Sequence, residues 1–196
     1  MLFRSATAQF IWDELQSPEG GYYCSIDADS EGEEGKYYVW SHSEIVEMLG
    51  KDAYLFCRWF NITEEGNWEG NNILNKCSEA EKFCETHSIA RQKLDSLIAA
   101  GILKLKAARK KRVAPATDDK ILLGWNALLL AAFCRCYAAT GKSIYRESAF
   151  ALFQFIEKAF LENNNWRHAY QNGSSRIPAF LDDLAFLTEA CLLLQE

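Results

Sequence analysis

The sequence has few prolines and few histidines, three of each among its 196 residues. So little proline excludes collagen-like repeats and proline-rich, low-complexity chains. Every apolar run falls short of the roughly 18 to 20 uncharged residues that a membrane span requires, and residues 1–5 lack the apolar core of a signal peptide. We therefore expect a cytoplasmic protein with no membrane partner.

Cysteine is more frequent, but no two cysteines have the Cys-x-x-Cys spacing of a zinc ribbon. Their odd number and irregular intervals also argue against a disulfide framework; the seven are residues 24, 57, 77, 84, 134, 136 and 191. No Walker loop or Gly-x-Gly-x-x-Gly motif occurs. We expect reduced thiols, no metal site and no cofactor.

Positive charge is the scarcer sign. Lys and Arg total 21 against 27 Asp and Glu, which gives a net charge of −6 and an isoelectric point near 5.2. Nucleic acid is an unsuitable partner, because phosphate-backbone binding needs clustered cations. With 49% apolar residues and no linker or shift in composition, we expect residues 1–196 to form a single domain.

Apolar residues recur mainly at helical spacing. They predict helices over 3–16, 42–49, 51–60, 79–86, 89–110, 119–139, 143–161 and 180–195. Ser41 with Glu44, and Ser78 with Glu81, have the spacing of capping boxes. Short β-like runs are 22–25 and 36–40, and Asn172-Gly173 indicates a hairpin.

Two of these helices differ from the others. The segments 119–139 and 180–195 are apolar on every side, whereas 3–16 and 143–161 are apolar on one side only. One-sided helices alternating with helices buried all round are typical of two concentric helix layers. The fold class we predict is therefore all-α, with short β-hairpins in the loops.

An aspartate pair stands near the start of each apolar helix, namely Asp118-Asp119 and Asp182-Asp183. Aspartate at a helix N-terminus caps free N–H groups and complements the helix dipole. In a two-layer barrel the same position lies at the mouth, where a carboxylate can do acid–base chemistry. We expect one member of each pair to cap and the second to be the better catalytic candidate.

Residues 27–35 form an acidic, glycine-containing loop, and aromatic residues follow it at 37, 38 and 40. The loop begins like an EF-hand, but Tyr38 stands where the bidentate glutamate would be, so we reject that motif. Carboxylates that bind hydroxyls, beside aromatic faces that stack on sugar rings, are typical of a carbohydrate subsite. A solvated acidic hairpin tip explains the composition equally well.

Basic residues cluster only at 109–112, where they suit either an anion site or the C-terminus of a helix, the second being favoured. Among the histidines, His42 and His87 fall at helix ends on the surface. His168, after Trp166 in the predicted hairpin, is the one with the best prospect of a catalytic role.

Four motifs resemble one protein family in the same order along the chain. They are PEGGYY at 18–23, DADSEGEEGKYYVW at 27–40, DDKIL with Trp125-Asn126 at 118–126, and RIPAFLDD at 176–183. The family is the YyaL family, also called spermatogenesis-associated protein 20-like. The second motif is long and unusual, so the resemblance is specific.

The resemblance implies a partial (α/α)6 toroid, similar to six-hairpin glycosidases and to sugar 2-epimerases. In the family this toroid is joined to a thioredoxin-like domain, whose cysteine motif this sequence lacks. Roughly seven or eight long helices stand where a closed toroid needs twelve, so we expect a central fragment of a longer protein. Its apolar edges predict self-association.

We weigh two functions. The first is a carbohydrate-active domain, either hydrolase-like or epimerase-like, in which the catalytic candidates are Asp119, Asp183 and Asp29. The substrate-binding candidates are Glu31, Tyr38, Trp40, Asp118, Trp125, Asn126, His168 and Asp182. The second function is a non-catalytic scaffold that binds a protein or glycan beside a thioredoxin-like domain. A converging pair of carboxylates favours the first and separate capping carboxylates favour the second.

Overall fold

The computed structural model describes residues 2–76 and 79–195 and is mostly helical, with small antiparallel sheets. It divides into two compact units, described separately here. Unit 1 comprises residues up to Ile26 together with those from Thr117 onward, and unit 2 comprises Asp27–Ala116. The expectation of a single domain over 1–196 stays a prediction.

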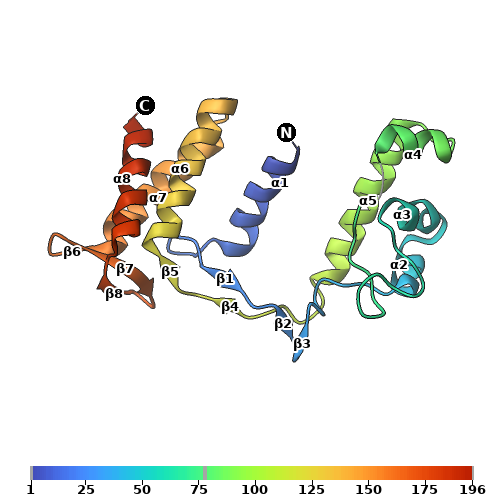
Figure 1. The fold of residues 1–196 in the computed structure, drawn as a ribbon, viewed down its shortest axis with the longest axis horizontal. Helices are drawn as coiled ribbons and strands as arrows, with labels where there is room; N and C mark the ends of the chain where they lie inside the picture. The colour runs from blue at the N-terminus through green and yellow to red at the C-terminus, as the bar shows by residue number, and fades with distance from the viewer. Residues whose placement is uncertain (1, 77–78, 196) are drawn as a thin grey trace. The chain divides into compact units, whose positions relative to one another are not determined.

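Three long helices dominate unit 1: α6 (Leu123–Thr140), α7 (Ser143–Phe160) and α8 (Leu181–Gln195). Helix α6 packs against both of the others, and the three lie side by side in Figure 1. Gly141 ends α6 in the left-handed conformation that glycine adopts without strain. The N-terminal α1 (Leu2–Phe10) continues into a π-helical turn, η1 (Ile11–Leu15).

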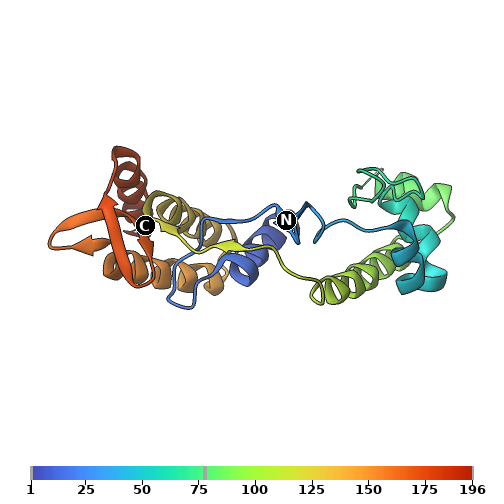
Figure 2. The same ribbon diagram turned by 90° about the horizontal axis from the view of Figure 1, so that it is seen from below.

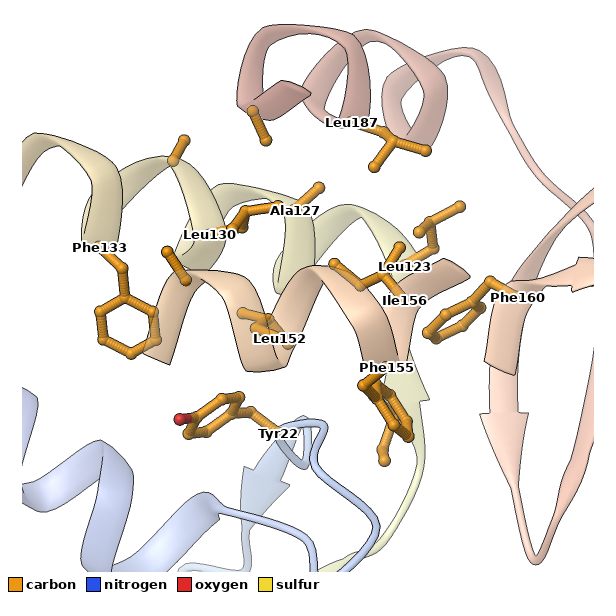
Figure 3. Packing of buried hydrophobic residues seen from close by; sticks show 14 of the residues in the cluster. Tyr22, Leu123, Ala127, Leu130, Phe133, Leu152, Phe155, Ile156, Phe160 and Leu187 are labelled. Carbon is orange, nitrogen blue, oxygen red and sulfur yellow. The ribbon is translucent and has the colours of Figure 1, made fainter. Parts of the chain in front are cut away.

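The core of unit 1 lies between these helices. Figure 3 shows Leu123, Ala127 and Leu130 of α6 between the side chains of α7 and Leu187 of α8. Leu152 and Ile156 of α7 are almost fully buried against them. Apolar burial of this kind is the main favourable contribution to folding.

A small sheet lies at the end of the bundle where α6 and α8 begin (Figure 1). Strand β7 (Asn165–Gln171) pairs with β5 (Ile121–Leu122), β6 (Leu161–Glu162) and β8 (Ser174–Pro178), all antiparallel. Asn172 and Gly173 join β7 to β8 with φ of 52° and 74°, as a tight hairpin turn requires. The predicted hairpin is confirmed.

The N-terminal segment is fastened to α6 by Asn126. Its amide oxygen accepts from the Tyr22 N–H at 2.9 Å, and its amide nitrogen donates to the Tyr22 carbonyl at 3.0 Å. Strands β1 (Ser25–Ile26) and β4 (Thr117–Asp118) pair just beyond. Gly21 lies so close to Phe155 that a Cβ would come within 2.3 Å of the ring.

Tyr170 connects the sheet to the same segment. Its ring packs on Phe155 and Phe160, and its hydroxyl donates a hydrogen bond to Glu19. This hydrogen bond, followed by burial, raises the pKa of Tyr170 from 10.0 to about 12.

Unit 2 is built on the long helix α5 (Arg91–Arg109). Against it lie α2 (His42–Leu49), α3 (Ala53–Trp59) and α4 (Ala80–Thr86), as Figure 2 shows from below. The predicted capping box is present in α2, where Ser41 and Glu44 exchange hydrogen bonds. A short 3-10 turn, η2 (Gly50–Asp52), precedes α3. Ser78 and Cys77 lie outside the described residues.

Arg112 holds the acidic loop in place. One guanidinium nitrogen donates to the carbonyls of Lys36, Tyr37 and Val39 at 3.2, 3.2 and 2.7 Å. The other donates to Glu44 at 3.0 Å, and the guanidinium carbon lies 3.9 Å from the ring centre of Trp40. This end of the basic run therefore binds backbone of its own unit, a role more specific than solvated charge.

Three expectations need correction. Residues 36–40 are not a strand, because three of their carbonyls turn toward Arg112; the hairpin strands are β2 (Asp29–Ser30) and β3 (Glu33–Glu34), inside the acidic loop. The helix predicted from residue 119 begins at Leu123, after β5. The third concerns α6 and α8, which are not buried all round: Trp125 is 56% exposed and Leu181 85%.

Two further findings concern the described residues as a set. None of their helices has the length and apolar character needed to cross a membrane. Within them, no three His, Cys, Asp or Glu side chains are grouped so that they could hold a metal ion.

Tyr170 generates a prediction about alkaline stability. Because its pKa is raised in the folded state, its contribution to stability is complete below pH 10 and is lost as the pH rises through about 12. Tyr170→Phe should lower the free energy of unfolding near neutral pH by about 1 kcal/mol and flatten this alkaline decline. Urea denaturation across pH 8–12 measures both. If the free energy of unfolding of the variant falls equally steeply with pH, other groups cause the alkaline decline.

Arg112 generates a second prediction, because lysine keeps the charge but cannot bind several carbonyls in one plane. Arg112→Lys should lower the free energy of unfolding of unit 2 by about 2 kcal/mol. The matched control is Arg109→Lys, since Arg109 only lies 5.4 Å over the rings of Tyr37 and Tyr38. Hydrogen exchange of the 36–40 amides reports the effect, and equal protection in both variants would contradict it.

Candidate functional site

The carboxylate of Asp183 joins the starts of two helices. It lies in the first turn of α8 and is only 1% exposed. One oxygen accepts from the Gly124 N–H of α6 at 2.9 Å, and the other accepts from the Phe180 N–H at 2.8 Å. Both are backbone donors that a helix leaves free at its N-terminus. The capping role expected for one member of this aspartate pair is thus carried by Asp183.

His168 completes the arrangement from β7. Its Nδ1 lies 2.8 Å from the Asp183 oxygen that also binds Phe180. An ionised carboxylate only accepts, so in a neutral imidazole that faces it Nδ1 carries the proton, and Nε2 has no hydrogen-bond partner among the described residues. The side chain is 23% exposed, and its ring packs edge-on against Phe180 with the ring centres 4.7 Å apart. Asp183 therefore fixes both the tautomer and the orientation of this imidazole.

Gly124 is required by the same contact. A Cβ at this position would lie 2.8 Å from the Asp183 oxygen, closer than atoms that are not hydrogen bonded approach one another. The sequence reasoning did not single out Gly124 or Phe180. The sequence indicated them only indirectly: Gly124 precedes Trp125, and Phe180 lies within the RIPAFLDD motif.

The other aspartates of unit 1 have separate partners. Asp118 forms an ion pair with Lys120 at 2.7 Å, and the hydrogen bond from Lys120 lowers the pKa of Asp118. The exposed Asp119 accepts from the Gln171 side chain. Asp182 is exposed at the start of α8. The structure therefore brings Asp183 together with His168, and each of these other aspartates has a different environment.

Trp125 and Asn126 are consecutive on α6 but have opposite surroundings. Trp125 is 56% exposed, whereas Asn126 is 2% exposed and has all its described hydrogen bonds to backbone atoms of Tyr22 and Leu122. Trp125 is thus available to a ligand, while Asn126 holds the chain together.

The remaining predicted residues belong to unit 2. Asp29 is exposed in β2, and Glu31 is exposed and lies 3.6 Å from Lys36. Trp40 is buried, 4% exposed, beneath Arg112. Tyr38 is 39% exposed and packs edge-on against Tyr37. Trp68, which was not among the predicted residues, is 41% exposed.

The chain aligns with curated proteins over nearly its whole length. It is 28% identical to the uncharacterized protein B0495.5 of Caenorhabditis elegans, with 91% of the chain covered. It is 25% identical to spermatogenesis-associated protein 20 of Homo sapiens and 26% to that of Mus musculus, with 96% covered in each. The chain is a distant homologue of spermatogenesis-associated protein 20. The recognised resemblance is confirmed.

These relatives are much longer than the chain. It spans 28% of spermatogenesis-associated protein 20 from either mammal and 29% of the worm protein. No protein-family model matches the chain. The names of the relatives state no reaction.

The Asp183 network generates a matched pair of substitutions. Asp183→Asn removes the charge from a buried acceptor of three hydrogen bonds, and should lower the free energy of unfolding by about 2–3 kcal/mol. Asp182→Asn changes the exposed neighbour and should alter it by less than about 0.5 kcal/mol. Denaturant unfolding of the two variants makes the comparison. Equal, small effects would show that the network contributes little to stability.

Proposed function

We propose that this chain is part of a carbohydrate-active (α/α)6 toroid in which His168 acts as a general base on a sugar. The observation that carries the proposal is the His168–Asp183 pair: a buried carboxylate on Nδ1 and an accessible ring face beside the start of α8. With Nδ1 bound to the carboxylate, Nε2 is the ring nitrogen that can accept a proton, and the 23% exposure of the side chain gives solvent partial access to the imidazole. The packing of α6 between α7 and α8 supports the helical-hairpin architecture.

The chemistry that fits is proton abstraction from a carbon beside a carbonyl. Nε2 takes the C2 proton of an open-chain sugar, and an enediolate is left. The imidazolium that forms is stabilised by the negative charge of Asp183. Return of a proton from the imidazolium to the same face of C2 completes exchange with solvent; inversion at that carbon needs in addition a proton donor on the opposite face.

Two-carboxylate hydrolysis fits less well. Asp183 uses both oxygens in hydrogen bonds and is 1% exposed, so it has no face for a glycosidic oxygen. Asp119 is exposed and is bound to Gln171. A hydrolase needs two carboxyls facing each other about 5 to 10 Å apart. We therefore favour the epimerase-like alternative over the hydrolase-like one.

A specific observation favours the scaffold alternative as a second candidate. Asp183 serves as a cap whether or not chemistry occurs. In addition, α6 and α8 expose apolar side chains, among them Trp125, Leu181 and Leu192. Such faces suit a binding partner or a second copy of the chain. The expected self-association stays a prediction, and light scattering on the purified protein measures it.

Proton NMR in D2O with a panel of aldoses and disaccharides tests the proposal, using this protein and the full-length human relative in parallel. We expect deuterium to replace the C2 proton of at least one sugar. His168→Gln should slow this exchange at least about 100-fold, with an unchanged near-UV circular dichroism spectrum. Asp119→Asn is the matched control and should retain the rate.

The other outcomes select the alternatives. A new anomeric signal without deuterium at C2, lost in Asp119→Asn, would establish hydrolysis. Exchange that survives in His168→Gln would remove His168 from the mechanism. If neither protein causes deuterium exchange, a new anomeric signal or broadening of the sugar signals, the scaffold function is favoured.

A further inference from the structure

Unit 2 contains a cleft of about 760 Å³ that is separate from the residues of the His168 site. Its walls are the acidic loop from Ser30 to Val39, Glu44 of α2, the turn Trp68–Asn71 and residues 111–113. This volume lies in the range of small-molecule sites in proteins. All of these residues belong to unit 2.

Trp68 stands on a tight turn and lines this cleft. Trp68 and Asn71 exchange backbone hydrogen bonds of 2.9 and 2.7 Å, and Glu69 and Gly70 between them have φ of 44° and 78°. The left-handed conformation of Glu69 is unfavourable for a residue with a side chain. A large apolar ring that is 41% exposed on a strained turn is typical of a binding surface rather than of packing.

Both walls of the cleft are held rigidly. On one side, Arg112 binds the carbonyls of Lys36, Tyr37 and Val39. On the other side, Asn67 donates to the carbonyls of Asn61 and Ile73 at 3.0 and 2.9 Å and accepts from the Ile73 N–H at 2.8 Å. A preorganised cleft loses little conformational entropy when a ligand binds.

Charge in the cleft is mixed in sign. Lys36 lies between Glu31 and Glu33, and Arg112 binds Glu44. Among the described residues, the lining side chains Glu34, Glu69 and Lys111 form no ion pair, so both signs face the ligand. The glutamates disfavour phosphates and other anions, and the cations disfavour a polybasic peptide. A neutral ligand with many hydroxyls can donate to the first set and accept from the second.

We propose that this cleft binds a neutral oligosaccharide, with one sugar ring stacked on Trp68 and its hydroxyls bound by the charged walls. This binding site is independent of His168 and adds a second contact for carbohydrate. It also revises the expected stacking residues: Trp40 is buried beneath Arg112, and Trp68 takes its place.

Titration calorimetry of the whole protein with maltotriose, cellotriose and chitotriose tests the proposal. At least one trisaccharide should bind, and Trp68→Ala should weaken its binding at least about tenfold. Trp68→Tyr keeps an aromatic face and should stay within about threefold. The control is Tyr54→Ala, because Tyr54 is 61% exposed in the same unit but does not line the cleft.

Three results would overturn the proposal. The first is no binding of any of the three sugars to the folded protein. The second is an equal loss of binding in Trp68→Ala and Tyr54→Ala. The third is that tetralysine or glucose 6-phosphate binds, that this binding is lost in Trp68→Ala, and that the trisaccharides do not bind. Deuterium exchange at C2 of the sugar, which tests His168, is measured separately, so failure here is distinguishable from failure of the proposed function.

Discussion

A buried carboxylate must be matched by donors, and in unit 1 this requirement brings Asp183 and His168 together. Asp183 is removed from water and accepts from two backbone N–H groups and one imidazole. The two backbone donors fix where α6 begins relative to α8, because each is a group that its helix cannot satisfy internally. The orientation of His168 and the need for glycine at 124 both follow from this one group.

In unit 2 a cation, Arg112, binds backbone carbonyls, whereas in unit 1 a carboxylate binds backbone N–H groups. The acidic loop of unit 2 runs through residues 36–40 without a strand partner for the carbonyls of Lys36, Tyr37 and Val39, and Arg112 supplies the donors. The planar guanidinium also covers the ring of Trp40, so the polar contacts and the apolar contact come from one side chain. In both units a charged group thus satisfies backbone atoms outside the regular ladders.

Local patterns predicted the elements well where local physics decides them. The Ser41–Glu44 box and the Asn172-Gly173 turn depend on residues three apart or adjacent, and both are present. Residues 36–40 read as a strand because their aromatic residues favour extended backbone, but the partner of their carbonyls lies more than 70 positions away. The all-round apolar pattern of α6 and α8 indicated burial, yet part of that surface is exposed in this chain.

The candidate site was only partly accessible to sequence reasoning. Asp183 and His168 were singled out separately, one as a helix-start carboxylate and the other as a histidine in the predicted hairpin. Their contact depends on the antiparallel pairing of β8 with β7. The spacing of residues in the sequence does not predict this contact. Trp68 carried no periodic signal, because it stands in a loop defined by glycines and asparagines. Its exposure becomes visible only with the turn geometry.

Unit 2 interrupts unit 1 in the sequence, and this has a consequence for synthesis. The segment ending at Ile26 is synthesised before unit 2, but its partner Asn126 lies 104 residues beyond Tyr22. All of Asp27–Ala116 is made in between and contains the partners for its own core. The contacts between the two parts of unit 1 can therefore form only after all of unit 2 has been synthesised. Contacts between residues so far apart in sequence slow folding and favour incompletely packed intermediates.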